Sequence, residues 1–190
     1  SWVNHAGIKR EVRYRVPNKN QCKECHSTND VISPIGPKAR NLDKNLTYGS
    51  ETKNQLAYLL QKGVIDSIPL NFQTVSDWED ESQSLEDRAR AYLAINCGHC
   101  HTPSGVANST GLYLDFNEVR PLHLGINKSP VATGRGSGGL KYSIVPGKPE
   151  ESILLHRMIS TDPGVMMPES GRALNHSEAI ELIGSWISSM

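Results

Sequence analysis

The chain has 190 residues and a formal net charge of zero, because its 20 Lys and Arg balance its 20 Asp and Glu. This balance argues against a nucleic-acid partner, and no segment approaches the ~18 apolar residues that a membrane-spanning helix needs. The first residues are Ser1-Trp2-Val3, without an initiator Met. We therefore expect either a mature protein after cleavage or a piece of a longer one.

The first 75 residues are expected to form an N-terminal arm and a first small domain. Residues 1–20 are typical of an extended arm, in which Val12, Tyr14 and Val16 alternate with Arg as in a short strand. Three leucines on one face predict a helix over residues 51–63. Residues 66–82 are polar, and we place the boundary between a domain at 1–75 and a domain at 76–190 in this segment.

The second domain, residues 76–190, contains three predicted helices. Ser84-Leu-Glu-Asp87 resembles a capping box, and it opens a helix that continues to Asn96. A second helix begins at Pro149 and is followed by a loop with Met166-Met167-Pro168. The last helix spans residues 177–188. The sequence therefore predicts a mostly α fold.

Four cysteines form two close pairs, and each pair is followed at once by a histidine. The two segments are Cys22-Lys-Glu-Cys25-His26 and Cys97-Gly-His-Cys100-His101. C-x-x-C-H is the attachment signature of c-type haem. The two thiols reach the two vinyl groups on one edge of the porphyrin, and the following His ligates the iron. We therefore expect two covalent haems, with His26 and His101 as iron ligands.

Other uses of paired cysteines fit the sequence less well. A thioredoxin-like site has one C-x-x-C near a βαβ pattern, and no such pattern is visible. Zinc sites usually place two C-x-x-C pairs about 15–20 residues apart, whereas 72 positions separate Cys25 from Cys97. Disulfides within each pair would not require a neighbouring His twice. Haem c is attached outside the bacterial cytoplasm, so the motifs predict a periplasmic or extracellular protein.

The order of elements in the second half resembles that of a class I cytochrome c: helix, C-x-x-C-H, long loop, helix, Met-Pro loop and terminal helix. In that family the first and last helices cross, and the Met loop supplies the sixth iron ligand. The resemblance implies Met167 as the second ligand of the haem at His101, with Met166 as its rival. It also places Tyr92 and Trp186 near the helix crossing. By extension we expect two small cytochrome c-like domains, each around one haem.

Several strings along the chain look like those of one group of proteins: NQCKECH, PIGPKARNLD, NQLAYLL, RARAYLAINCGHCH, SIVPGKPEESILLHRM and MMPESGR. Through them the chain, from about Val12 onward, resembles a bacterial family of dihaem cytochrome proteins, often hypothetical. Members of this family are sometimes fused to or encoded beside oxidoreductases. The resemblance implies a redox protein or a dehydrogenase as the partner.

The sixth ligand of the first haem is left open by the sequence. No Met and no His occurs between Thr28 and Asn96. The N-terminal arm could supply His5, or the second domain could supply His123 or, with less support, His156. The iron could also be five-coordinate or bound by water, Tyr or Lys.

His99, inside the second motif, is expected to face solvent. Haem propionates need cationic or hydrogen-bonding partners, and the candidates are Lys38, Arg40, Arg135 and Lys141.

Two functions follow from these expectations. The first is electron transfer between redox partners through two low-spin haems, without a chemically transformed substrate. The second is a haem enzyme, or a protein that binds a diatomic gas or peroxide at an open first haem. The missing sixth ligand motivates the second function, and the absence of a visible acid–base constellation argues against it.

Overall fold

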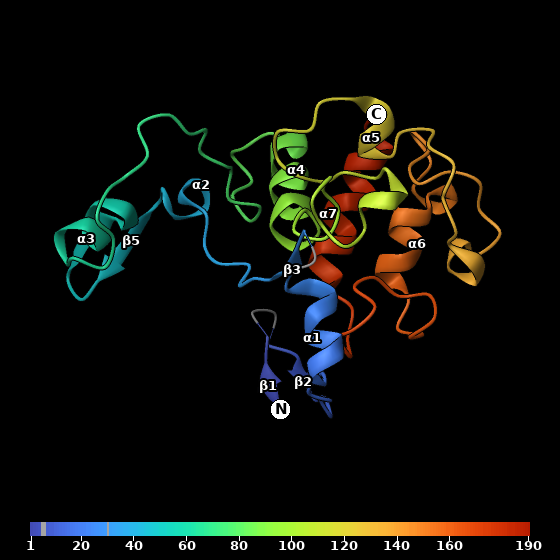
Figure 1. The fold of residues 1–190 in the computed structure, drawn as a ribbon, viewed down its shortest axis with the longest axis horizontal. Helices are drawn as coiled ribbons and strands as arrows, with labels where there is room; N and C mark the ends of the chain where they lie inside the picture. Colours follow the sequence, from blue (N-terminus) through green and yellow to red (C-terminus); the bar gives the residue numbers. More distant parts are fainter. Residues whose placement is uncertain (5–6, 30) are drawn as a thin grey trace.

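The computed structural model describes residues 1–4, 7–29 and 31–190. Its α-helices are α1 (Lys19–Cys25), α2 (Ala39–Leu42), α3 (Gln55–Gln61), α4 (Leu85–Asn96), α5 (Pro121–Leu124), α6 (Ile153–Ile159) and α7 (Ser177–Ser188). Short 3-10 helices are η1 (Asn108–Thr110), η2 (Gly134–Ser137) and η3 (Pro149–Glu151). Figure 1 shows α4, α6 and α7 together in the main body of the molecule.

The strands form three separate two-stranded antiparallel sheets. The pairs are β1 (Trp2–Val3) with β2 (Lys9–Arg10), β3 (Ser27–Thr28) with β4 (Val31–Ile32), and β5 (Asn45–Tyr48) with β6 (Glu51–Asn54). In the longest pair, Asn45 lies opposite Asn54 and Tyr48 lies opposite Glu51. Each sheet is therefore a local hairpin, and none of the three pairs joins distant parts of the chain.

The hydrophobic core lies where α4 packs against α7. In α7 the buried residues recur at a helical spacing, since Ala179, Leu182, Ile183, Trp186 and Ile187 line one face. They meet the buried face of α4, which includes Ala89 and Leu93. The indole N–H of Trp186 also donates a hydrogen bond to the carboxylate of Glu86 on α4. Both Tyr92 and Trp186 belong to this core, as expected.

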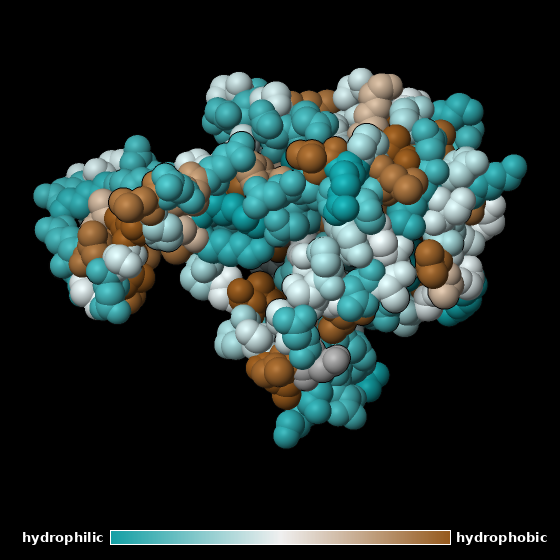
Figure 2. Space-filling model, turned by 45° about the horizontal axis from the view of Figure 1, so that its top comes forward, coloured by the Kyte–Doolittle hydropathy of each residue, from teal (hydrophilic) through white to brown (hydrophobic). Residues whose placement is uncertain are grey.

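The first half of the chain has very little buried apolar surface. Among its described residues up to position 80, Leu56 is the only buried hydrophobic one. The β5–β6 hairpin and α3 project to one side of the body on extended connections (Figure 1). Hydrophobic side chains remain on the surface of this projection (Figure 2). This half therefore packs on the second half at a few points and does not enclose a core of comparable size.

The predicted fold class, mostly α with two small cytochrome c-like domains, is wrong. Only 34% of the chain is helical, and small antiparallel sheets occupy parts of the first half. The reason is visible in the first 75 residues, where short polar segments lack the sustained apolar periodicity that a packed helix needs. Within the described ranges, no helix has the length and apolar character needed to cross a membrane.

Candidate functional site

Both cysteine-histidine motifs contain the same backbone hydrogen bond, although the first lies in α1 and the second in a turn after α4. In the first, α1 places Cys22 and Cys25 three residues apart, and the amide of His26 donates to the carbonyl of Cys22 at 2.9 Å. In the second, the amide of His101 donates to the carbonyl of Cys97 at the same distance. Residues three apart on a helical turn lie on one face. Each motif therefore presents two thiols on one side, with the histidine next to them.

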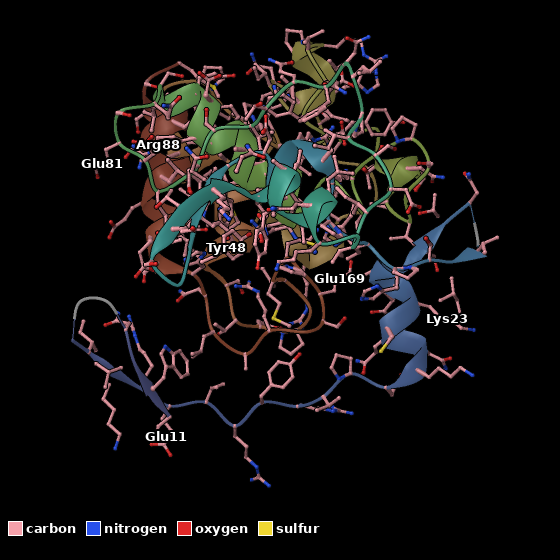
Figure 3. The ribbon with its side chains drawn as sticks, turned by 90° about the vertical axis from the view of Figure 1, so that its left-hand side faces the viewer. Glu11, Lys23, Tyr48, Glu81, Arg88 and Glu169 are labelled. Atoms are coloured by element: carbon pink, nitrogen blue, oxygen red, sulfur yellow. The ribbon has the colours of Figure 1, made fainter. Side chains whose placement is uncertain are left out.

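The first turn is fixed by a cap at the start of α1. The side chain of Asn18 accepts hydrogen bonds from the amides of Asn20 and Gln21, each at 3.0 Å. Gln21 in return accepts from the amide of Asn18, which completes a capping box. Such a cap holds a seven-residue helix that has no buried residue of its own. Figure 3 shows α1 with Lys23 on its exposed side.

His101, in the second motif, is half-buried and oriented by a backbone contact. Its Nδ1 lies 3.3 Å from the carbonyl oxygen of Leu112. Burial lowers the pKa of His101, although the Leu112 carbonyl acts in the opposite direction. A neutral imidazole that donates from Nδ1 keeps its Nε2 lone pair for a metal. This orientation leaves Nε2 of His101 available to hold a metal.

The backbone closes tightly around the second motif, and two glycines permit this. A Cβ on Gly98 would lie 2.8 Å from the carbonyl oxygen of Ala94. A Cβ on Gly105 would collide with the carbonyl group of Cys100. The loop can thus fold over the motif only with glycine at these positions.

Burial also raises the pKa of Cys97 to about 12, so its thiol stays protonated at neutral pH.

The Met-Pro loop lies against α6, on the side that carries Arg157. The amide of Met167 donates to the carbonyl of Arg157 at 3.0 Å, and Arg157 Nε donates to the carbonyl of Val165 at 2.8 Å. Arg157 is also close enough to His101 to contribute to the lowered pKa of that imidazole. Met167 is half-buried, whereas Met166 is only 6% exposed. Met167 is therefore the more accessible sulfur in this region.

The first motif is far more open than the second. Both Cys22 and His26 are exposed. After His26 the chain enters the β3–β4 hairpin. The amide of Ser33, just after β4, donates a hydrogen bond to the carbonyl of His26 at 3.0 Å. The His26 ring has no hydrogen-bond partner among the described residues.

The two motifs meet through Cys25, His99 and Cys100. Their ligand atoms all lie within 4.8 Å of one another. Hydrogen bonds from Cys100 and His99 to its sulfur lower the pKa of Cys25 to about 4, and the pKa of Cys100 rises for the same reason. All four cysteines are free thiols. No local pattern in the sequence indicates this contact, because 75 positions separate Cys25 from Cys100.

His99 does not face solvent, so that expectation is wrong. The side chain is half-buried, and its Nδ1 is buried without a hydrogen-bond partner. In the described part of the chain only one other buried side-chain nitrogen or oxygen, Arg172 Nε, shares this condition. A buried polar atom without a partner is uncommon and calls for an explanation.

The remaining predicted histidines lie in different surroundings. His123 Nδ1 lies 3.0 Å from the carbonyl oxygen of Gly111, and its ring stacks on Tyr113 with 4.8 Å between centroids. His156, on α6, packs against Gly138, where a Cβ would meet its Nε2 at 2.5 Å. His5 lies outside the described residues.

The cations proposed as propionate partners are largely engaged by carboxylates. Lys38 Nζ and Arg40 Nη2 lie 3.4 Å and 3.0 Å from the same oxygen of Asp115. Arg135 pairs with Asp162 at 2.9 Å. The Asp115 contacts join α2 to the loop that follows the second motif.

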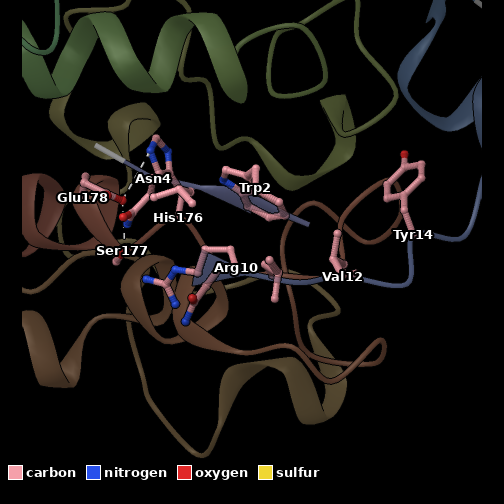
Figure 4. Close-up of a pocket in the computed structure, with 12 residues that line it drawn as sticks. Trp2, Asn4, Arg10, Val12, Tyr14, His176, Ser177 and Glu178 are labelled. Carbon is pink, nitrogen blue, oxygen red and sulfur yellow. Dashed lines mark hydrogen bonds and ion pairs between the residues drawn. The ribbon is translucent and has the colours of Figure 1, made fainter. Parts of the chain in front are cut away.

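A cavity of about 490 Å³ lies between the N-terminal arm and the segment leading into α7 (Figure 4). The cavity is lined by Trp2, Arg10 and Tyr14 from the arm and by His176 and Glu178 from the other side, among others. None of the cysteines or histidines of the two motifs lines it. The cavity is therefore separate from the cysteine-histidine motifs.

Comparison with known proteins gave no family, no curated protein and no solved structure that matches this chain.

Proposed function

We propose that this chain is a dihaem c-type cytochrome that works in the periplasm or outside the cell and passes electrons between redox partners. The observation that carries the proposal is the backbone hydrogen bond that both motifs share, from the histidine amide to the carbonyl of the first cysteine, with the cysteines free of disulfide bonds. Two thiols and a histidine are the donor set that covalent haem attachment requires. A shared hydrogen bond at two distant positions favours two sites of one chemistry.

Within each proposed site, the cysteines would attach the haem and the histidine would ligate its iron. Cys22 and Cys25 would hold one haem and Cys97 and Cys100 the other, and His26 and His101 would ligate the two irons. The iron of haem c supplies the chemistry, since it takes up and releases one electron at a time. In the second site the Leu112 carbonyl fixes the orientation of His101 at 3.3 Å, and Met167 is the proposed second ligand. A thioether ligand raises the reduction potential.

The contact between the motifs supports electron exchange within the molecule. The sulfur atoms of Cys25 and Cys100 lie within 4.8 Å of each other. Haems attached through these two sulfurs would have adjacent attachment points. Short separations favour rapid electron exchange, so an electron accepted at one site could leave from the other. The proposed partners are redox proteins or a dehydrogenase.

A second candidate is a haem enzyme, or a gas- or peroxide-binding protein, and the openness of the first motif favours it. His26 and Cys22 are exposed, so a small molecule could approach an iron bound there. This candidate requires that the first haem lack a sixth protein ligand. Binding of carbon monoxide to the reduced protein distinguishes it from the electron carrier.

The test is a haem count on protein exported from a host that attaches haem c. We expect two haems per chain by the pyridine haemochrome assay, and both should remain on the chain under denaturing conditions. Cys22→Ala/Cys25→Ala and Cys97→Ala/Cys100→Ala should each leave one. Two sulfurs and one imidazole nitrogen would also suit Zn²⁺ or Cu⁺, so metal content is measured on the same samples. Fully exported protein with zinc or copper and no covalent haem would refute the proposal.

A further inference from the structure

We infer that His99, inside the second motif, is the sixth ligand of the first haem. The second attachment loop would then hold one haem through Cys97, Cys100 and His101, and would ligate the iron of the other through His99. This inference rests on the proposed function, because it requires a haem at Cys22 and Cys25. It assigns a role that the sequence analysis gave to no residue of this loop.

The first observation is position. One of the two ring nitrogens of His99 lies within 4.8 Å of the sulfur of Cys25. Cys25 is one of the two attachment points of the first haem, and His26 follows it directly. His26 would supply one ligand of the iron, and a second protein ligand would have to lie close to the motif. Among the described histidines other than His26, His99 is the one that contacts a first-motif cysteine.

The second observation is an unmet bonding capacity. The Nδ1 of His99 is buried and has no hydrogen-bond partner. Leaving a buried donor or acceptor unpaired is destabilising. Bonding to iron would use an imidazole nitrogen that the protein has already removed from water. The half-buried side chain would also lose less freedom on binding than an exposed one.

The third observation is that the side chains of His99 and His101 lie toward different neighbours. His99 and His101 are two positions apart in one turn, and residues at this spacing do not face each other. His101 is turned toward the carbonyl of Leu112 at 3.3 Å. His99 instead lies beside Cys25 of the other motif. The two imidazoles therefore serve different sites.

The competing histidines are held elsewhere. His123 is engaged by the Gly111 carbonyl at 3.0 Å and stacks on Tyr113. His176 Nδ1 lies 3.0 Å from the hydroxyl of Tyr92. His156 packs against Gly138. None of these contacts involves the first motif, whereas a ring nitrogen of His99 lies within 4.8 Å of the Cys25 sulfur.

This ligation gives the two haems unequal potentials. The first would have two imidazoles, and the second would have an imidazole and the Met167 thioether. Since the thioether raises the potential, the first haem is the stronger reductant. Electrons would pass from the haem at Cys22 and Cys25 to the haem at Cys97 and Cys100.

The experiment uses the matured, exported protein with its haems counted. The wild type should contain one bis-imidazole haem and one imidazole–thioether haem, which near-infrared magnetic circular dichroism distinguishes. Its reduced form should not bind carbon monoxide. In His99→Ala the count should stay at two per chain, while one haem becomes high-spin and binds carbon monoxide. Added imidazole should restore the low-spin state.

Two further variants make the assignment specific. His123→Ala, a matched loss of one histidine, should leave both spectra unchanged. His99→Met should replace the bis-imidazole signature with a second imidazole–thioether one and raise the lower potential. If His99→Ala fails to mature, His99→Met decides on the same signature.

The inference is overturned if the wild type has no bis-imidazole haem, if that haem persists in the His99 variants, or if His123→Ala is the variant that opens it. A wild type without two covalent haems would instead overturn the proposed function.

Discussion

His26 and His101 occupy the same place in their motifs and have very different surroundings. His101 is half-buried and oriented by Leu112, whereas His26 is exposed and has no such partner among the described residues. A hydrogen bond from the other ring nitrogen to a carbonyl fixes the ring of a metal-bound imidazole and raises its basicity. The two proposed haems would therefore differ at the proximal side as well as in their sixth ligands.

The two adjacent methionines can be separated by substitution. We expect Met167→Ala to abolish the imidazole–thioether signature of the second haem and to lower its potential, because a thioether ligand is lost. Met166→Ala should keep the signature and destabilise the fold by about 2–5 kcal/mol, because Met166 is buried. Near-infrared spectra and denaturant unfolding give the two readouts. Loss of the signature in Met166→Ala alone would make Met166 the ligand.

Tyr92 gives a prediction for alkaline pH. Burial raises the pKa of Tyr92 to about 12, above the ordinary value of about 10. The neutral phenol is thus favoured in the folded state, so this stabilisation is complete below pH ~10 and is lost as the pH rises toward 12. Tyr92→Phe should cost about 1 kcal/mol at pH 7, because the contact with His176 is lost.

Above pH ~10 the free-energy difference between the wild type and Tyr92→Phe should shrink, since the phenylalanine variant has no phenol to ionise. Denaturant unfolding of both proteins across this range measures it. A difference that stays constant with pH would show that Tyr92 ionises equally in the folded and unfolded states.

At the scale of the elements, stability is concentrated where α4 crosses α7. Ile183 is completely buried in this interface, whereas Ile159, at the end of α6, is 48% exposed. Ile183→Ala should lower the free energy of unfolding by about 2–5 kcal/mol, because it leaves a cavity. The same change at Ile159 should cost less than about 1 kcal/mol. Similar losses at both positions would contradict the assignment of the core to α4 and α7.

These two helices are also the elements that the sequence predicted best. The predicted helix to Asn96 is confirmed as α4, with Ser84 as its N-cap accepting from the amide of Asp87 at 3.1 Å. The last helix is confirmed over Ser177–Ser188. Both have a sustained apolar face and meet each other, so local pattern and tertiary packing favour the same structure.

The helix predicted over residues 51–63 is only half correct. Residues Glu51–Asn54 are strand β6, and α3 begins at Gln55. The leucines that suggested the helix lie only in its second part. The first part pairs with β5 across a turn at Gly49, whose φ of 66° favours glycine. The predicted strand through Val12, Tyr14 and Val16 is wrong, since these residues have no regular structure.

The candidate site was predictable only as far as it is local. The spacing of Cys, Cys and His within five residues identified both motifs. The contact of Cys25 with His99 and Cys100 depends on how the first half folds back on the second, and no periodic pattern records that. His99 accordingly had no signal in the sequence beyond its place within a motif.

Across the whole molecule, the first half is attached to the second by a small number of polar contacts. Tyr14 donates to the carbonyl of Gly171 at 3.2 Å, and the amide of Asn29 donates to the carbonyl of Ser104 at 3.1 Å. Asp115 receives both Lys38 and Arg40. With little apolar burial in the first half, these contacts bear directly on how firmly the two motifs are kept together.

Asp115→Asn should therefore loosen α2 and the segment around it. Burial alone would raise the pKa of Asp115, but the Asn117 amide, Arg40 and Lys38 together hold it below its usual value. The attachment should thus be complete above pH ~4 and weaken as the pH falls below it. The variant removes this charge pairing at every pH, at a cost of about 1–3 kcal/mol.

Native-state hydrogen exchange at pH 7 and at acid pH resolves the effect by segment. In Asp115→Asn, α2 should exchange faster at pH 7, while α4 and α7 keep their protection because their core is untouched. Glu151→Gln is the matched control, since the Glu151–Lys148 pair lies three residues apart and holds no distant segments together. If α2 is equally protected in the wild type and both variants, the apolar contacts of the first half are sufficient by themselves. The proximity of Cys25 to Cys100 would then not depend on this ion pair.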